Sequence, residues 1–145
     1  MSKKSAKIAA LIEGCRGRDL DPYYLGYFEC FNSGCFYEAH DVLEELWLAQ
    51  RGGPNDAFYK GLIQLAGAFV HLQKHTEARP RLRPAAALFR LARTNLQAFA
   101  PVHERLDVKK ALALIDDWLK RLDSNADVNP LNSDSAPKLF PLPGP

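Results

Sequence analysis

The sequence has few of the features that mark secreted or membrane proteins. It contains only three cysteines, Cys15, Cys30 and Cys35, and no C-x-x-C pair, so neither a disulfide framework nor a zinc knuckle is expected. No stretch approaches the roughly 20 apolar residues that a membrane span needs. The apolar run near the N-terminus is short, and Glu13 interrupts it, which disfavours a signal sequence. We therefore expect a cytoplasmic protein with reduced thiols and no contact with a membrane.

Strong charge and familiar catalytic motifs are also missing. The formal net charge is only +2, which gives no global attraction to nucleic acid or lipid. The sequence shows no phosphate-binding glycine loop, no nucleophile elbow and no H-E-x-x-H pattern. Hydrophobic residues make up 47% and charged residues 25% of the 145 residues, a composition typical of one globular domain.

Helical periodicity dominates what is present. Asp21 and Pro22 form a helix start, because an aspartate caps free N–H groups and proline suits the first helical position. In the fifth expected helix, Leu88, Leu91 and Leu96 are expected to face inward. No run alternates as a strand would. The expected helices cover about residues 5–13, 22–31, 35–50, 57–78, 84–99 and 108–122.

These helices predict an all-α fold, a single-domain antiparallel bundle of five to six helices, because short connections favour antiparallel neighbours. The bundle is expected to span residues 1–122. Residues 123–145 are polar and contain several prolines, so they are interpreted as a C-terminal tail, with Leu139 and Phe140 as a docking point. The fourth helix has the widest apolar arc, which predicts a central position.

The third expected helix carries a stripe of three carboxylates, Glu38, Asp41 and Glu45. Like charges at this spacing repel one another, so the stripe needs solvent, a cation or a basic partner. A solvated face is the simplest interpretation, and a metal site is the alternative. His40 and Glu44 lie one turn apart at the border of this stripe.

The fourth expected helix carries a narrow polar stripe opposite its apolar arc, made of Lys60, Gln64, Gly67 and His71. Gly67 removes side-chain bulk beside the stripe, so a neighbouring backbone or a small ligand could approach there; close helix packing is the favoured interpretation. Antiparallel packing of helices three and four predicts one polar cluster across this notch. Its expected members are His40, Glu44, Trp47, Lys60, Gln64 and His71.

A basic cluster follows, made of Arg79, Arg81, Arg83, Arg90 and Arg93. Such a cluster could contact phosphates, but no aromatic residues are interleaved with it to stack on bases. A solvated face or a partner for the acidic stripe of the third helix is the favoured interpretation. Nucleic-acid binding is therefore disfavoured, although it stays an alternative.

Two motifs resemble a known family. The runs FNSGCFYEAHDVLEELW, from Phe31 to Trp47, and FYKGLIQLAGAFVHL, from Phe58 to Leu72, resemble the domain of unknown function 309 family. The resemblance implies an all-helical fold and brings no established activity. Asp41 replaces the glutamate that usually follows the histidine. The matching positions are Asn32, Gly34, Glu38, Ala39, His40, Glu44, Glu45, Trp47, Gly61, Leu62, Ile63, Gln64 and His71.

Three hypotheses of function remain open from the sequence. The first is a non-catalytic helical interaction or scaffold domain, with a protein partner or a second copy, in which the buried polar cluster sets the helix register. The second is a metal-assisted hydrolase that uses His40, Glu44 and His71. The third is nucleic-acid binding through Arg79–Arg93. We expect no cofactor and no tightly held metal. A cleft that is open to solvent at the cluster would favour the enzyme hypothesis. A dry cluster whose polar groups are all hydrogen-bonded would favour the scaffold hypothesis.

Overall fold

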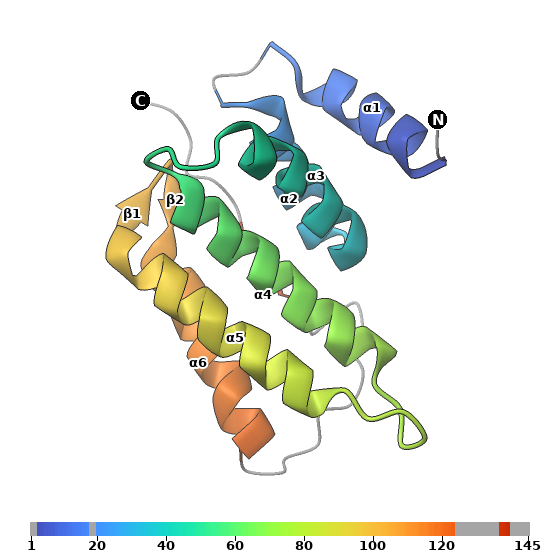
Figure 1. The fold of residues 1–145 in the computed structure, drawn as a ribbon, viewed down its shortest axis with the longest axis vertical. Helices are drawn as coiled ribbons and strands as arrows, with labels where there is room; N and C mark the ends of the chain where they lie inside the picture. The colour runs from blue at the N-terminus through green and yellow to red at the C-terminus, as the bar shows by residue number, and fades with distance from the viewer. Residues whose placement is uncertain (1–2, 18–19, 124–136, 140–145) are drawn as a thin grey trace.

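The computed structural model describes residues 3–17, 20–123 and 137–139 (Figure 1). Within these residues the chain forms six α-helices, one short 3-10 helix and a two-stranded hairpin. The all-α prediction is therefore confirmed. The helices are α1 (Lys3–Cys15), α2 (Pro22–Asn32), α3 (Phe36–Ala49), α4 (Asp56–Lys74), α5 (Leu82–Leu96) and α6 (Val108–Asp123).

Helix boundaries follow the local signals of the sequence. The Asp21 carboxylate accepts a hydrogen bond from the Tyr23 N–H at 2.8 Å, and Pro22 is the first residue of α2. The Asp107 carboxylate accepts from the Lys110 N–H at 3.0 Å at the start of α6. Both aspartates thus satisfy N–H groups that a helix start leaves without a partner.

Helix α4 is the centre of the bundle. Figure 1 shows α3, α4 and α5 side by side with alternating directions, and α6 lies against α5. Leu62, Ala66 and Phe69 of α4 are completely buried, which confirms the predicted central position of this helix. The two faces of α4 are covered by different neighbours, so a site on its remaining surface is bordered by both α3 and α5.

Aromatic rings fill the centre around Phe69. Its ring centroid lies 5.0 Å from that of Phe36 on α3 and 5.2 Å from that of Phe89 on α5. Phe31 on α2 and Trp118 on α6 are each 5.7 Å away. Side chains from five helices therefore meet at one aromatic cluster.

Two local predictions were wrong. Leu91 is 50% exposed, whereas Phe89 and Ala92 are buried, so α5 is rotated about its axis relative to the expected orientation. The hairpin of β1 (Val102–His103) and β2 (Leu106–Asp107) was not expected. Each strand has two residues, too few for a periodic signal.

The C-terminal region is described only at residues 137–139. Helix α6 ends at Asp123, next to the boundary predicted at residue 122. Pro137 and Leu139 are buried against the bundle, and Leu139 belongs to the hydrophobic core. Phe140, the other half of the expected docking point, lies outside the described residues together with the rest of the tail. Among the helices that the structure describes, none has the length and apolar character to cross a membrane.

Candidate functional site

A pocket of about 240 Å³ opens between α3, α4 and α5. It contains three of the polar residues that the sequence singled out, His40, Gln64 and His71, together with Gly67. Its remaining walls are apolar or aromatic. The lining residues are Tyr37 and His40 from α3, Ile63, Gln64, Gly67, Val70 and His71 from α4, and Leu88 from α5.

His71 is the most unusual group in the pocket. Its Nδ1 atom is buried and has no hydrogen-bond partner, which is uncommon for a buried polar atom. Burial lowers the pKa of His71, and the nearby charges of Arg81 and Lys74 lower it further. Both effects favour the neutral imidazole. A neutral ring carries one donor and one acceptor nitrogen, so the hydrogen-bonding capacity of Nδ1 is unused in this arrangement.

Gln64 is held by α5 and not by α3. Its side-chain oxygen accepts a hydrogen bond from the Asn95 side-chain nitrogen at 2.7 Å. This bond fixes the orientation of the Gln64 amide and leaves the Gln64 nitrogen available as a donor. The predicted cluster is thus shared between three helices, because α5 contributes Asn95 and Leu88.

His40 lies between two carboxylates of its own helix. Its Nδ1 atom is 3.3 Å from Asp41 Oδ1, and its Nε2 atom is 3.7 Å from Glu44 Oε2. The Tyr37 ring lies parallel to the imidazole, with centroids 6.4 Å apart, and the Lys74 ammonium lies over the Tyr37 ring. His40 is therefore positioned at the α3 wall of the pocket, while Glu44 does not line it.

Trp47 and Lys60 do not line the pocket. The Trp47 indole N–H donates to Asp56 Oδ1 at 2.7 Å, and the Gly52 N–H donates to Asp56 Oδ2 at 2.7 Å. Both bonds lower the pKa of Asp56, and the bond from Gly52 has the larger effect. Together they join the ends of the α3–α4 loop. Lys60 is exposed. Trp47 therefore stabilises the loop and not the predicted polar cluster.

The carboxylate stripe of α3 is not a uniform surface. Glu45 is exposed, Glu38 is half-buried, and Asp41 is buried. Within residues 3–17, 20–123 and 137–139, no three His, Cys, Asp or Glu side chains lie close enough together to hold a metal ion. The pocket itself contributes two histidines from different helices, so the geometry does not favour the proposed hydrolase ligands His40, Glu44 and His71.

The small residues of α4 accommodate side chains of α5. A Cβ atom built on Gly61 would lie 2.8 Å from Leu96 Cγ, closer than packed side chains approach. A Cβ atom on Gly67 would lie 3.1 Å from the terminal Leu88 Cδ1. Gly61 therefore allows close packing of α4 on α5, whereas Gly67 faces Leu88 at the pocket wall.

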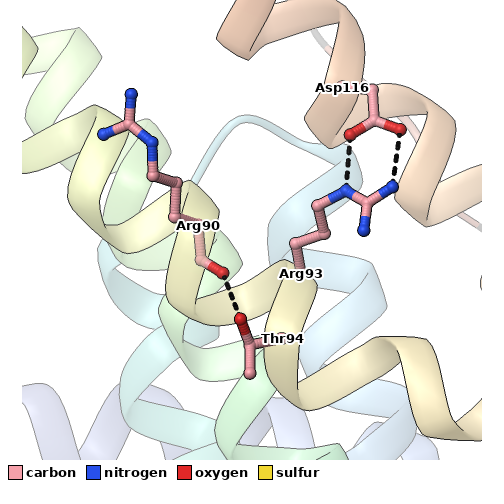
Figure 2. A network of polar contacts seen from close by, with 4 residues as sticks. All are labelled: Arg90, Arg93, Thr94 and Asp116. Atoms are coloured by element: carbon pink, nitrogen blue, oxygen red, sulfur yellow. Dashed lines mark hydrogen bonds and ion pairs between the residues drawn. The ribbon is translucent and has the colours of Figure 1, made fainter.

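The basic cluster is partly neutralised by α6. Figure 2 shows Arg93 facing Asp116 with two hydrogen bonds, from Nε at 2.7 Å and from Nη2 at 3.3 Å. Arg90 Nη2 lies 3.6 Å from Asp123 Oδ1. The acidic partners of these two arginines are on α6, and not on the α3 stripe as expected. Two arginines of the cluster are therefore paired with carboxylates of α6 at the surface.

The sequence analysis missed a second polar group near the hairpin. Asn55 Oδ1 lies 2.7 Å from His103 Nε2, and the His103 ring contacts Phe58 and Phe99. The Tyr24 hydroxyl donates to the Glu104 carbonyl at 2.9 Å. These contacts attach the hairpin to α2 and α4. Only a lone histidine in an aperiodic segment could have indicated them from the sequence.

Glu44→Ala tests whether the cluster stabilises the bundle. A buried cluster would lose about 1–3 kcal/mol with this change. In the structure the His40 and Glu44 side chains are 33% and 44% exposed, and an ion pair of that exposure contributes about 0–1 kcal/mol. We expect urea unfolding to show a loss below about 1 kcal/mol, similar to that of the exposed control Glu45→Ala. A loss above 2 kcal/mol for Glu44→Ala alone would restore the buried-cluster interpretation.

Comparison with known families adds one finding. Residues 24–79 match the model of the family described as Domain of unknown function (DUF309). The predicted family resemblance is confirmed over this segment. The DUF309 segment contains the pocket residues of α3 and α4, whereas Leu88 of α5 lies outside it. No match to the chain was found among curated proteins or among solved structures.

Proposed function

We propose that this protein is a non-catalytic helical binding domain, and that the pocket between α3, α4 and α5 takes one aromatic side chain of a protein partner. The supporting observation is the buried, unpartnered Nδ1 atom of His71 in a pocket with apolar walls. A side chain with an apolar body and one polar tip would match both the apolar walls and the unpartnered nitrogen. Tyrosine and tryptophan side chains have this character and are frequent anchors of protein interfaces.

The size of the pocket supports a side chain over a larger ligand. Pockets for drug-sized molecules enclose about 300–1,000 Å³. The 240 Å³ pocket is smaller than that range. Interface anchors fill small, well-packed pockets, so a single ring suits this volume better than a cofactor or a nucleotide.

The walls of the pocket provide both kinds of contact. Ile63, Val70 and Leu88 would bury the faces and edges of a ring. His71 would bind the polar tip once its ring turns to expose Nδ1, the buried atom that lacks a partner within the protein. Tyr37, 50% exposed at the same pocket, offers a further aromatic surface to a partner.

The pocket is open to solvent, which is the outcome named above as favouring the enzyme. The arrangement of the histidines nevertheless favours binding over catalysis. A general base works with a nucleophile or a substrate held by an orienting group. The nitrogens of His40 face Asp41 and Glu44 of its own helix, and His71 Nδ1 faces no protein group. The two rings therefore show no relay to a nucleophile, whereas each can contribute to the wall of a binding pocket.

A pair of probes tests the proposed function. We expect p-cresol, a stand-in for the tyrosine side chain, to bind with a millimolar Kd and to shift the His71 ring signals in NMR titrations. Toluene, which lacks the hydroxyl, should bind several-fold more weakly, because one hydrogen bond contributes about 0.5–1.5 kcal/mol.

Two variants localise the binding. Val70→Phe should fill the pocket and abolish the His71 shifts, whereas Leu48→Phe, at an exposed position on α3 that does not line the pocket, should leave them unchanged. Equal binding of p-cresol to the Val70→Phe variant, or no saturable shift at His71 in the unmodified protein, would reject the proposal.

A further inference from the structure

One asparagine of the bundle binds the backbone of the C-terminal segment. The Asn32 side-chain nitrogen donates to the Leu139 carbonyl at 2.6 Å, and the Leu139 N–H donates to the Asn32 side-chain oxygen at 2.7 Å. One side-chain amide thus pairs with both backbone groups of one residue. Neighbouring strands exchange backbone hydrogen bonds in a similar way.

Burial along the segment alternates. Pro137 and Leu139 are buried, while Lys138 between them is exposed. Successive side chains of an extended segment point to opposite sides, so this pattern is that of an extended peptide lying on a surface. Leu139 is only 1% exposed and is part of the continuous hydrophobic core. The bundle therefore holds this segment by its backbone and by alternate side chains.

The turn that follows Asn32 is closed by hydrogen bonds of other residues, so the Asn32 side-chain amide is available to bind the backbone of the C-terminal segment. Asn32 is the last residue of α2, and the backbone N–H groups of Ser33 and Cys35 both bond to the Cys30 carbonyl. The Gln73 side chain of α4 donates to the Gly34 carbonyl at 2.9 Å. The turn is thus attached to α4, and the Asn32 side chain forms its two hydrogen bonds with Leu139.

We propose that Asn32 and the apolar surface under Leu139 form a docking site for an extended peptide, and that the chain's own Pro137–Leu139 segment occupies it as an exchangeable ligand. The partner that fits is an extended segment with leucine at the paired position and a proline two residues before it. The residue at the paired position needs its own N–H, which excludes proline there. This site is separate from the pocket, since neither Asn32 nor Leu139 lines it.

Recognition of this kind combines two contributions. Main-chain hydrogen bonds provide affinity for any extended peptide, and pockets for alternate side chains provide specificity. A tethered segment acts at an effective concentration in the millimolar range, so a free peptide competes poorly while the tail is docked. Undocking the tail should therefore increase the apparent affinity for the same sequence added in trans.

The experiment uses the full chain and a fluorescent synthetic peptide, SAPKLFPL, which corresponds to residues 135–142. We expect the Leu139→Ser chain to bind this peptide at least about 10-fold more tightly than the unmodified chain, because its own tail no longer competes. The matched control Lys138→Ser changes an exposed position of the same segment and should behave like the unmodified chain. Combining Asn32→Ala with Leu139→Ser should abolish the gain.

Equal affinity of the Leu139→Ser and unmodified chains, or a gain that survives the loss of Asn32, would overturn the proposal. Circular dichroism of each variant identifies a folding defect. A second measurement needs no variant: millimolar SAPKLFPL should shift the Leu139 amide signal of the unmodified chain, whereas SAPKSFPL should not. Absence of this displacement would also overturn the proposal. A dimer that dissociates in the Leu139→Ser chain would assign the occupant to a second copy and contradict docking within one chain.

Discussion

Replacing Phe69 with alanine is expected to lower the free energy of unfolding by about 3–5 kcal/mol. The Phe69 ring is completely buried at the point where rings from α2, α3, α5 and α6 meet. Its removal eliminates contacts with all four elements, and the surrounding rings are themselves packed and cannot collapse into the cavity. Equilibrium unfolding in urea measures the loss.

Phe99→Ala is the matched control, because it removes the same ring from a half-buried position on the 3-10 helix Gln97–Phe99. We expect its effect to be less than half that of Phe69→Ala. A loss below about 1.5 kcal/mol for Phe69→Ala would show that the aromatic cluster is not the main source of stability.

Gly61→Val is expected to destabilise the protein by about 2–4 kcal/mol, by overpacking the α4–α5 interface. The first added atom would lie 2.8 Å from Leu96 Cγ and 3.2 Å from Asn95 Cβ. Leu96 is completely buried, so its side chain has no free space into which to move. The higher helix propensity of valine offsets only a few tenths of a kcal/mol. Because Asn95 holds Gln64, the change should also disturb the pocket.

Gly67→Val provides the comparison at the same helix. Its nearest neighbour is the terminal Cδ1 of Leu88 at 3.1 Å, and Leu88 is only half-buried beside the open pocket. We expect a change within about 1 kcal/mol. Thermal and urea unfolding of the two variants measure the difference, and an equal loss for both would contradict the assignment of Gly61 as the position that sets the α4–α5 distance.

Local signals in the sequence predicted most of the helices. Asp21 and Pro22 act at the start of α2 as expected, since capping involves only residues a few positions apart. The width of the apolar arc predicted that α4 is central, because a helix that is apolar over much of its surface must be covered on several sides. The hairpin at residues 102–107 was not predicted, because strands of two residues are too short to show a periodic pattern.

The residues that line the pocket could be predicted from the sequence only in part. Spacing on α4 placed Gln64, Gly67 and His71 on one stripe, and antiparallel packing brought His40 toward them. The contributions of α5 could not be derived in this way. Leu91 was expected to face inward, yet α5 presents Phe89 and Ala92 to the core and directs Leu88 to the pocket. When apolar residues lie on both sides of the expected apolar arc, sequence periodicity does not determine how the helix is rotated about its own axis.

The sequence alone determined the helical class, the helix starts and the central role of α4, because these depend on interactions within one or two turns of chain. Tertiary structure decided which polar groups meet. Asn32 pairs with Leu139, Trp47 with Asp56, and Gln64 with Asn95. A hydrogen bond needs its two heavy atoms close together, and only the packing of the helices brings residues from separate parts of the chain to that distance. The unpartnered nitrogen of His71 arises in the same way, because the packing that buries it supplies no partner.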